Sequence, residues 1–341
     1  MKTDCKKPIF FKQNRVRRIY TGGKLFSQFF GDNSEDGFFP EEWVCSTTKA
    51  LNEGSTDEKE GVSITENGEY FDDLLEFNRY EMIGERKEFG VLVKILDSAI
   101  RLPVQAHPDK EFSKIYFNSN HGKAESWVIL ETRENACIYF GFKEKISTEE
   151  FENALNSGEE ALTPLLNRIP VKPGDVFYIP AKAVHAIGAG CLLLETQEPT
   201  DFTIQPEKTC GDYVLSDNEK YIGLKKEDAF KCFDMDLVGD KAINLSRKIP
   251  KLNNNKESLI TQNDTPWFSV NRYKLCNEKS EKLIGPAVYV ATSGNGKIEG
   301  KDFIRNIKKG DYFFIPFAAS SEYNLVSDKN LDVVQCLPPK E

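Results

Sequence analysis

The chain has 341 residues, of which 39% are apolar and 29% charged, a composition typical of a globular protein with one large domain or two of common size. Its net charge of −9 disfavours general attraction to nucleic acid or to an anionic membrane, and its eight cysteines, without a Cys-x-x-Cys pair, predict neither a disulfide framework nor a thiolate zinc site. Because no apolar run reaches the roughly 18 residues that span a bilayer, and the first residues lack the apolar core of a signal peptide, we expect a cytoplasmic protein.

The first quarter of the chain mixes a basic run with short extended segments. The basic run covers residues 12–18 and precedes a glycine pair that marks a turn, and we interpret it as a solvated surface. A short strand is expected within residues 38–46, and an acidic surface loop with three glycines at residues 51–68. The spacing of apolar residues then predicts a helix over residues 71–89.

Strand signals dominate the centre of the chain. A continuous apolar run at residues 91–96 leads into a second expected strand that holds Gln105 and His107, which are two positions apart and therefore share a face. A short helix is expected at residues 110–117, followed by a bulky, partly β-branched strand that begins near Glu125. Farther along, Ser147 opens a capping-box helix, and the strand-like segment 175–185 ends at a histidine.

An internal repeat indicates how the strands are organised. Residues 171–180 and 307–316 both contain a Gly-Asp turn, an apolar strand and an Ile-Pro pair. Five residues after the proline, the first copy has His185 and the second has Ser321. Repeated short strands with Gly and Pro turns predict a mainly β fold of the sandwich or barrel type. We expect a metal-binding β-domain at 1–215, a helical connection at 216–245, and a smaller C-terminal β-domain at 246–341 that lacks metal ligands.

Two of the three histidines in the chain suggest a metal site. His107 and His185 both occur in strand signals, beside Gln105 and Glu125. Two imidazoles, a carboxylate and an amide oxygen make a mixed set of ligands for a zinc-like divalent ion, with one position left for water or substrate. The alternative is that both histidines are ordinary packed or solvated residues, because ligands so widely separated in sequence form no strict motif.

Several ordered motifs resemble the type I mannose-6-phosphate isomerases in their short bacterial form. The resemblance extends from about residue 8 to residue 239. The segments that carry it are Leu96–Asp109, Gly122–Trp127 and Ile179–Gly188, with further matches at Tyr20–Gly23, Glu42–Ser46 and Glu195–Thr203. It implies a jelly-roll (cupin) catalytic domain that interconverts mannose 6-phosphate and fructose 6-phosphate. It also implies one zinc ion, with the ligands Gln105, His107, Glu125 and His185.

The reaction of that family moves a proton between C1 and C2 of the sugar through an enediol. It requires a base, an electrophile for the developing oxyanion and an anchor for the phosphate. The resemblance implies Glu195 as the general base, and we favour Lys123 as a second electrophile or proton shuttle. The alternatives are a Lys123 that only neutralises Glu125 and a Glu195 that only orients a histidine. The phosphate anchor stays open among Arg101, Arg168, Lys182 and Lys208.

One position departs from the family pattern. Gln205 stands where the family usually has an arginine near the active site, and a neutral amide cannot replace a guanidinium. Loss of such a donor costs roughly 10²–10³-fold in rate, although Lys208 is a candidate replacement. Gln205 therefore favours an alternative function, a zinc-binding cupin that recognises a sugar or sugar phosphate with little turnover. A metal-dependent oxygenase is a third possibility, which the Gln- and Glu-containing ligand set disfavours.

Of these functions we predict the isomerase. Its expected partner is a small-molecule sugar phosphate, with neither nucleic acid nor a membrane as a partner. No oligomeric state follows from the sequence.

Overall fold

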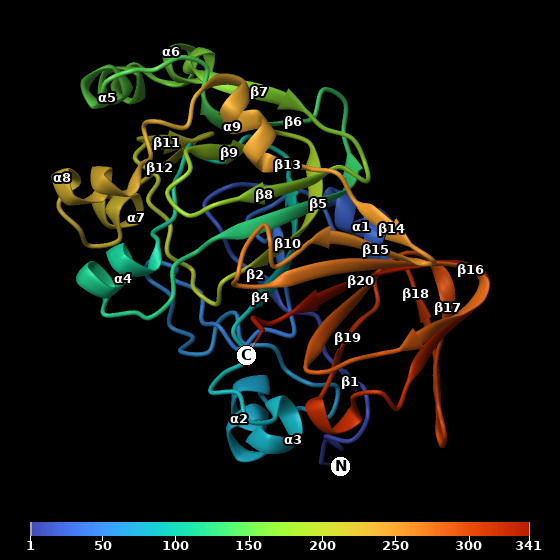
Figure 1. Cartoon of the computed structure of the whole chain (residues 1–341). Coiled ribbons are helices and arrows are strands. Elements are labelled where there is room, and N and C mark those ends of the chain that lie inside the picture. The colour runs from blue at the N-terminus through green and yellow to red at the C-terminus, as the bar shows by residue number, and fades with distance from the viewer. Residues whose placement is uncertain (1, 341) are drawn as a thin grey trace.

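The structure is a computed structural model that describes residues 2–340, and it consists mainly of antiparallel sheets (Figure 1). The first large sheet has seven strands, in spatial order β13 (Arg247–Lys248), β8 (Val176–Ile179), β5 (Glu125–Thr132), β10 (Cys191–Gln197), β4 (Leu92–Ser98), β3 (Glu41–Val44) and β2 (Arg15–Val16). The second has eight strands: β1 (Ile9–Phe10), β19 (Tyr312–Ile315), β17 (Ala287–Gly300), β20 (Asn324–Leu337), β16 (Ser269–Lys282), β15 (Lys256–Ile260) and β14 (Lys251–Asn253), with β18 (Phe303–Lys308) beside β17.

Two small sheets and nine short α-helices complete the described part of the chain. The small sheets are β7 (Leu166–Pro170), β6 (Cys137–Phe142) and β9 (His185–Ile187), and β11 (Thr209–Cys210) with β12 (Tyr213–Val214). The helices are α1 (Lys24–Phe30), α2 (Phe71–Phe77), α3 (Arg79–Ile83), α4 (Lys110–Phe117), α5 (Thr148–Ser157), α6 (Glu159–Leu162), α7 (Asp217–Tyr221), α8 (Lys226–Ala229) and α9 (Gly239–Ser246). Single 3₁₀ turns lie at Thr163–Leu165, Phe230–Cys232 and Phe317–Ala319. No helix within residues 2–340 has the length and apolar character needed to cross a bilayer.

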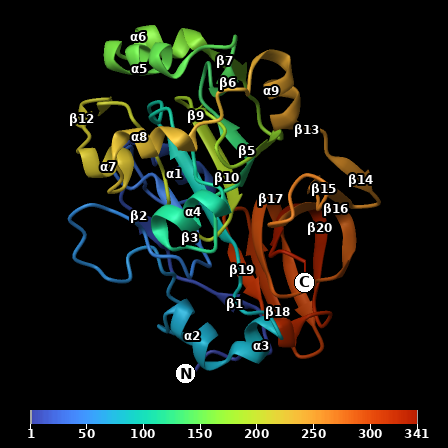
Figure 2. The same cartoon turned by 60° about the vertical axis from the view of Figure 1, so that its left-hand side comes forward.

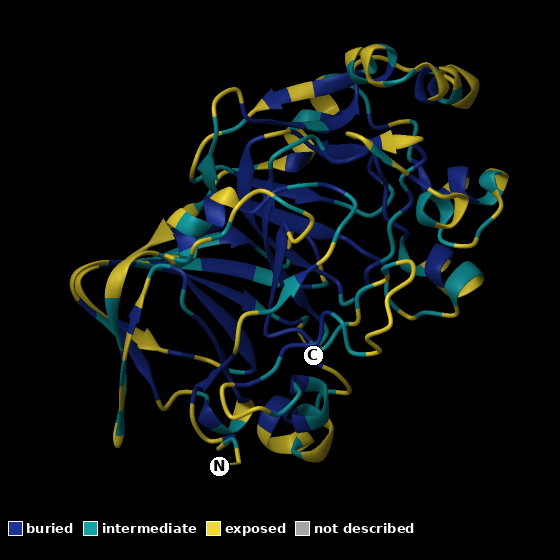
Figure 3. Cartoon of the chain, turned by 180° about the vertical axis from the view of Figure 1, so that it is seen from behind, coloured by how far each residue is buried: buried dark blue, intermediate teal, exposed yellow. Residues whose placement is uncertain are grey.

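The alternation of side chains along β10 gives the first sheet two different faces. Leu192 and Leu194 belong to a core that also contains Val290 and Val334 of the second sheet. Leu193, on the opposite face, belongs to a separate core beneath the β7-β6-β9 sheet. Because successive side chains on a strand point to opposite faces, the first sheet is covered on both sides. The central strands are accordingly buried, whereas α5 and α6 lie at the exposed periphery (Figure 3).

The two large sheets also exchange short strands. Ile9 of β1, near the N-terminus, lies opposite Phe314 of β19 in the second sheet. Arg247 of β13, at the start of the last hundred residues, lies opposite Phe177 of β8 in the first sheet. The C-terminal strands therefore pack directly against the rest of the molecule, as Figure 2 shows for the orange and red strands.

The structure confirms several of the expected elements and corrects others. The helix expected at residues 110–117 is α4, with Asp109 as its N-cap, and Ser147 forms the expected capping box of α5. The helix expected over 71–89 is wrong in extent, because α2 stops at Asn78, whose φ of −128° is not helical, and α3 ends before Gly84 at φ 68°. The positive φ at Gly84 suits glycine, since it carries no Cβ.

The internal repeat is confirmed at the level of its turn and strand. β8 and β19 are the two apolar strands, and they lie in different large sheets. Both turns have a glycine with positive φ, 94° at Gly174 and 93° at Gly310. In both, the following aspartate accepts the backbone N–H three residues earlier, at 3.1 Å for Asp175 and 2.8 Å for Asp311.

Candidate active site

A row of large and polar side chains crosses the first sheet on one face. Trp43 of β3 lies opposite Lys94 of β4, Lys94 lies opposite Glu195 of β10, and Glu195 lies opposite Trp127 of β5. Directly opposite residues in neighbouring antiparallel strands place their side chains on the same face. Glu125, two residues before Trp127, therefore faces the same way, so sheet register alone gathers two carboxylates and an ammonium group.

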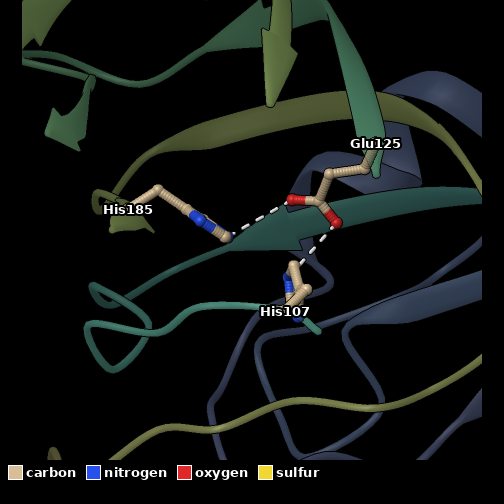
Figure 4. A group of neighbouring side chains, drawn as sticks. All are labelled: His107, Glu125 and His185. Atoms are coloured by element: carbon tan, nitrogen blue, oxygen red, sulfur yellow. Dashed lines mark ion pairs between the residues drawn. The ribbon is translucent and has the colours of Figure 1, made fainter. Parts of the chain in front are cut away.

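Three side chains next to this row form a compact group with metal-binding chemistry (Figure 4). Glu125 lies between two histidines, with Oε2 at 3.4 Å from Nε2 of His107 and Oε1 at 3.3 Å from Nε2 of His185. One potential ligand atom from each residue lies within 4.8 Å of the others. All three side chains are almost completely buried.

Hydrogen bonds to the backbone turn the free nitrogen of each histidine toward the centre of this group. Nδ1 of His107 lies 2.9 Å from the carbonyl oxygen of Phe202, and Nδ1 of His185 lies 2.9 Å from that of Ala183. Nδ1 must donate to a carbonyl, so the neutral ring keeps its lone pair on Nε2, the usual arrangement for a metal-bound histidine.

The Glu125 carboxylate and the Gln105 amide complete a set of donors that fits a divalent metal ion. Neither carboxylate oxygen of Glu125 has a hydrogen-bond partner among the described residues, although the Lys123 ammonium lies 3.6 Å away. A buried carboxylate in this state is costly unless cations neutralise it. The Gln105 amide lies 3.3 Å from Nε2 of His185. Either amide end can be turned inward, because its oxygen and nitrogen are interchangeable in shape.

A cavity of roughly 360 Å³ opens beside this group. Its lining includes Gln105, Lys123, Glu195 and Gln205 from the set of predicted site residues. The other charged residues that line it are Arg18, Glu41, Glu53, Lys94, Asp201 and Glu219. A cavity of this size with converging polar groups is typical of a small-molecule site.

Lys123 and Glu195 have the surroundings expected of residues that exchange protons. Nζ of Lys123 lies 3.1 Å from Nε2 of His107 and 3.6 Å from Oε2 of Glu125, and burial lowers the pKa of this lysine. Glu195 accepts the indole N–H of Trp127 at 3.1 Å. Burial, together with the negative charge of Glu125, raises the pKa of Glu195 above its ordinary value. Opposite pKa shifts of neighbouring groups are typical of sites that transfer protons.

Two further cations line the cavity, and one of them, Arg18, corrects the sequence interpretation. Arg18 belongs to the basic run expected to be solvated, yet its guanidinium is nearly buried, 2.9 Å from Asp201 and 3.0 Å from Glu41. Lys94 lies 3.6 Å from each of Glu41, Glu195 and Asp201. The sequence does contain a signal for the position of Lys94. A charged residue within an apolar run that forms a strand buried on both faces requires an oppositely charged partner. For Arg18 the sequence carried no such signal.

None of the four candidate phosphate anchors lines the cavity. Arg101 is committed to Glu207, with Nη1 at 2.7 Å from Oε1, and Nη2 of Arg168 donates to the carbonyl oxygen of Asn135 at 3.0 Å. Lys182 and Lys208 are absent from the described lining as well. Gln205 does line the cavity, and its amide donates to the carbonyl oxygen of Glu219 at 3.1 Å. This hydrogen bond holds the neutral Gln205 side chain against α7.

Local structure at the site differs from the expected strands in two places. Gln105 lies in an isolated bridge opposite His185 rather than in a full strand. His185 begins β9 instead of closing the previous strand, because β8 ends at Ile179 before a turn. The strand expected near Glu125 is confirmed as β5, which begins at that residue, and Lys123 lies just before it. Short bridges and turns replace regular strands here because Pro103, Pro108 and Pro180 lack the backbone N–H that a strand would use.

Known proteins are similar to this chain over most of its length. No protein-family model matches the chain. The mannose-6-phosphate isomerase ManA of Bacillus subtilis is 30% identical over 323 residues, which cover 91% of this chain and 93% of that protein. The mannose-6-phosphate isomerase of Streptococcus mutans is 28% identical over 317 residues, covering 91% of this chain and 92% of that protein.

Solved structures show the same relationship. The crystal structure of mannose 6-phosphate isomerase from Bacillus subtilis superimposes with a TM-score of 0.74 and 25% identity, covering 96% of this chain and 99% of that one. A variant of phosphomannose isomerase from Salmonella typhimurium shares the fold, with a TM-score of 0.72 at 15% identity over 98% of this chain and all of that one. These similarities define an enzyme of the aldose–ketose isomerase class. The chain belongs to the mannose-6-phosphate isomerase family.

Proposed function

We propose that the protein converts mannose 6-phosphate to fructose 6-phosphate at the cavity beside His107, Glu125 and His185. The observation that carries this proposal is the juxtaposition of a buried metal-binding group with Lys123 and Glu195 on the wall of one cavity. Membership in the mannose-6-phosphate isomerase family supports the substrate.

We infer that Gln105, His107, Glu125 and His185 hold the metal ion, and that the ion is zinc. The buried oxygens of Glu125, which accept no hydrogen bond from the described residues, support this ligand set, and a mixture of imidazole and oxygen donors suits zinc. When bound, zinc supplies Lewis-acid polarisation of the sugar oxygens at C1 and C2.

Two side chains, Glu195 and Lys123, then transfer the protons. Glu195 removes the proton from C2 of the aldose and returns it to C1, so that the sugar passes through an enediol. A carboxylate with a raised pKa suits this role, because it binds a proton strongly enough to abstract it and still releases it. Lys123 donates a hydrogen bond to the oxygen that gains negative charge and moves the hydroxyl proton from O2 to O1.

The architecture behind this site is also part of the proposal. We infer a jelly-roll domain at 1–215 with a helical connection at 216–245, and a second β-domain at 246–341 that has lost the metal ligands. The equivalent turns at Gly174 and Gly310 support a shared origin for the two β-domains. The buried contact between the two large sheets supports a structural role for the second.

The experiment that tests the function is NMR of mannose 6-phosphate incubated in D2O with the zinc-loaded protein. Proton abstraction by a side chain predicts fructose 6-phosphate that carries solvent deuterium at C1. The second candidate function, a protein that binds sugar phosphate with little turnover, is favoured by the neutral Gln205 at the cavity. Binding heat with mannose 6-phosphate, but no fructose 6-phosphate after prolonged incubation, would select that second function.

Replacing the neutral amide at the cavity wall is expected to increase turnover. Gln205→Arg adds a guanidinium to a cavity whose carboxylates outnumber its cations, and we expect kcat/KM to rise roughly 10-fold or more, by analogy with other positioned donors. Steady-state kinetics with mannose 6-phosphate measures the change, and Gln205→Met, which adds no charge, is the control. An unchanged kcat/KM in Gln205→Arg would show that the site does not need a cation at this position.

A further inference from the structure

A buried carboxylate outside the cavity holds the backbone on both sides of Lys123. The Glu198 side chain lies just beyond the end of β10, and the residue is 2% exposed. Its Oε2 accepts the N–H of Gly122 at 3.2 Å, and its Oε1 accepts the N–H of Ala124 at 3.2 Å. The N–H of Glu198 itself donates to the carbonyl oxygen of Ala124 at 3.1 Å. Three hydrogen bonds from one residue thus flank the lysine of the site.

Two further hydrogen bonds hold the backbone of residues 122–124. The N–H of Lys123 donates at 2.9 Å to the carbonyl oxygen of Pro108, which directly follows His107. The hydroxyl of Thr200 donates to the carbonyl oxygen of Gly122 at 2.9 Å. A Cβ at Gly122 would lie 2.7 Å from the carbonyl oxygen of Pro108, so only glycine permits this close approach.

Glu198 has no direct access to the substrate. It is absent from the described lining of the cavity that contains Lys123, and it lines a separate cavity together with His121 and Trp267. Any effect of Glu198 on the reaction must therefore pass through the backbone that it holds.

We propose that Glu198 is a positioning residue, which fixes Lys123 Nζ beside His107 and Glu125. The inference rests on the proposed function, because Lys123 has a place in the reaction only there. A carboxylate is required because both neighbours are N–H donors and each needs an acceptor oxygen. Glutamine has nearly the same shape but turns an NH2 group toward one of those donors, which loosens that side of the segment.

The test is Glu198→Gln in the full-length, zinc-loaded protein. We expect kcat for mannose 6-phosphate to fall roughly 10-fold or more, since small misplacements of a reacting group are costly, while KM and bound zinc stay unchanged. The matched control is Asp264→Asn, because Asp264 also accepts a backbone N–H, from Thr261 at 2.9 Å, but does not line the cavity. We expect this control to keep the wild-type kcat.

A second, milder variant covers the case in which Glu198→Gln does not fold. Thr200→Val removes the hydroxyl that donates to Gly122, and we expect kcat to fall about threefold at unchanged KM, the value of one hydrogen bond. A kcat equal to that of the wild type in a folded, zinc-loaded Glu198→Gln protein, or in Thr200→Val if the first variant does not fold, would overturn the proposal. So would a loss that appears in KM or in zinc content instead of kcat.

Amide hydrogen exchange tests the role of Glu198 independently of the proposed enzymatic function. If the wild-type protein turns over no mannose 6-phosphate, the function fails, and the role of Glu198 is then judged from exchange alone. The amides of Gly122 and Ala124 should both exchange slowly in the wild type, and at least one of them should exchange much faster in Glu198→Gln. Fast exchange of both amides in the wild type would overturn the positioning role whatever the activity.

Discussion

Glu195→Gln is expected to lower kcat for mannose 6-phosphate roughly 10²–10⁴-fold, the usual contribution of a general base. The amide keeps the size of the carboxylate and can still accept the indole N–H of Trp127, which lies 3.1 Å from Glu195. It cannot take up a proton from C2, so the loss should appear in kcat, with KM nearly unchanged. Steady-state kinetics measures both constants.

The pH dependence of the activity is a second test of Glu195 as the general base. Because burial and the charge of Glu125 raise the pKa of Glu195, wild-type activity should fall on acidification at a higher pH than an ordinary carboxylate would give. The base is lost when it protonates, so this acid limb should disappear from the residual activity of Glu195→Gln. Glu131→Gln, near the far end of β5, is the control and should behave as the wild type. A Glu195→Gln protein with wild-type kcat would exclude Glu195 as the base.

Glu125→Gln is expected to remove both the metal and the activity. The Glu125 carboxylate lies between His107 and His185, with the Lys123 ammonium 3.6 Å away, and it accepts no hydrogen bond from the described residues. Its charge is therefore the main attraction for a cation in the group. Without it we expect bound zinc to fall well below one ion per chain, and kcat to fall roughly 10³-fold, the value of several kcal/mol of lost charge stabilisation. Elemental analysis of the dialysed protein, together with kinetics, measures both effects.

The third histidine provides the control for this prediction. His121 pairs with Glu88 at 2.9 Å and is not part of the buried group. His121→Asn should therefore keep its zinc, which shows that loss of a histidine alone does not empty the site. Full zinc occupancy in Glu125→Gln would contradict the assigned ligand set.

Side-chain chemistry made the centre of the site predictable from the sequence. The chain has only three histidines and therefore only three possible pairs of imidazoles. The structure brings the pair His107 and His185 together with Glu125, although these residues are far apart in the sequence. Lys123 and Glu195 are placed at the same cavity. Their roles, and that of Gln105 as a ligand, stay predictions.

The parts that the sequence did not reveal depend on contacts between distant segments. Arg18 enters the site because β2 and β3 pair beside β4, and its surrounding residues look like an ordinary basic surface run. Ile9 pairs with Phe314 across some three hundred residues, and two apolar residues carry no local signal for that register. Proline-rich turns around Gln105 and His185 also replaced the expected strands, because local strand propensity does not specify where a backbone must bend.

The most direct test of the account is turnover of mannose 6-phosphate by the purified protein as isolated, after chelation, and after zinc is added back. We expect chelation to abolish formation of fructose 6-phosphate and zinc to restore it, because the proposed reaction needs a cation held at His107, Glu125 and His185. Turnover that persists undiminished after complete removal of the metal would contradict the metal-dependent site. No turnover with one zinc ion bound per chain would contradict the isomerase itself.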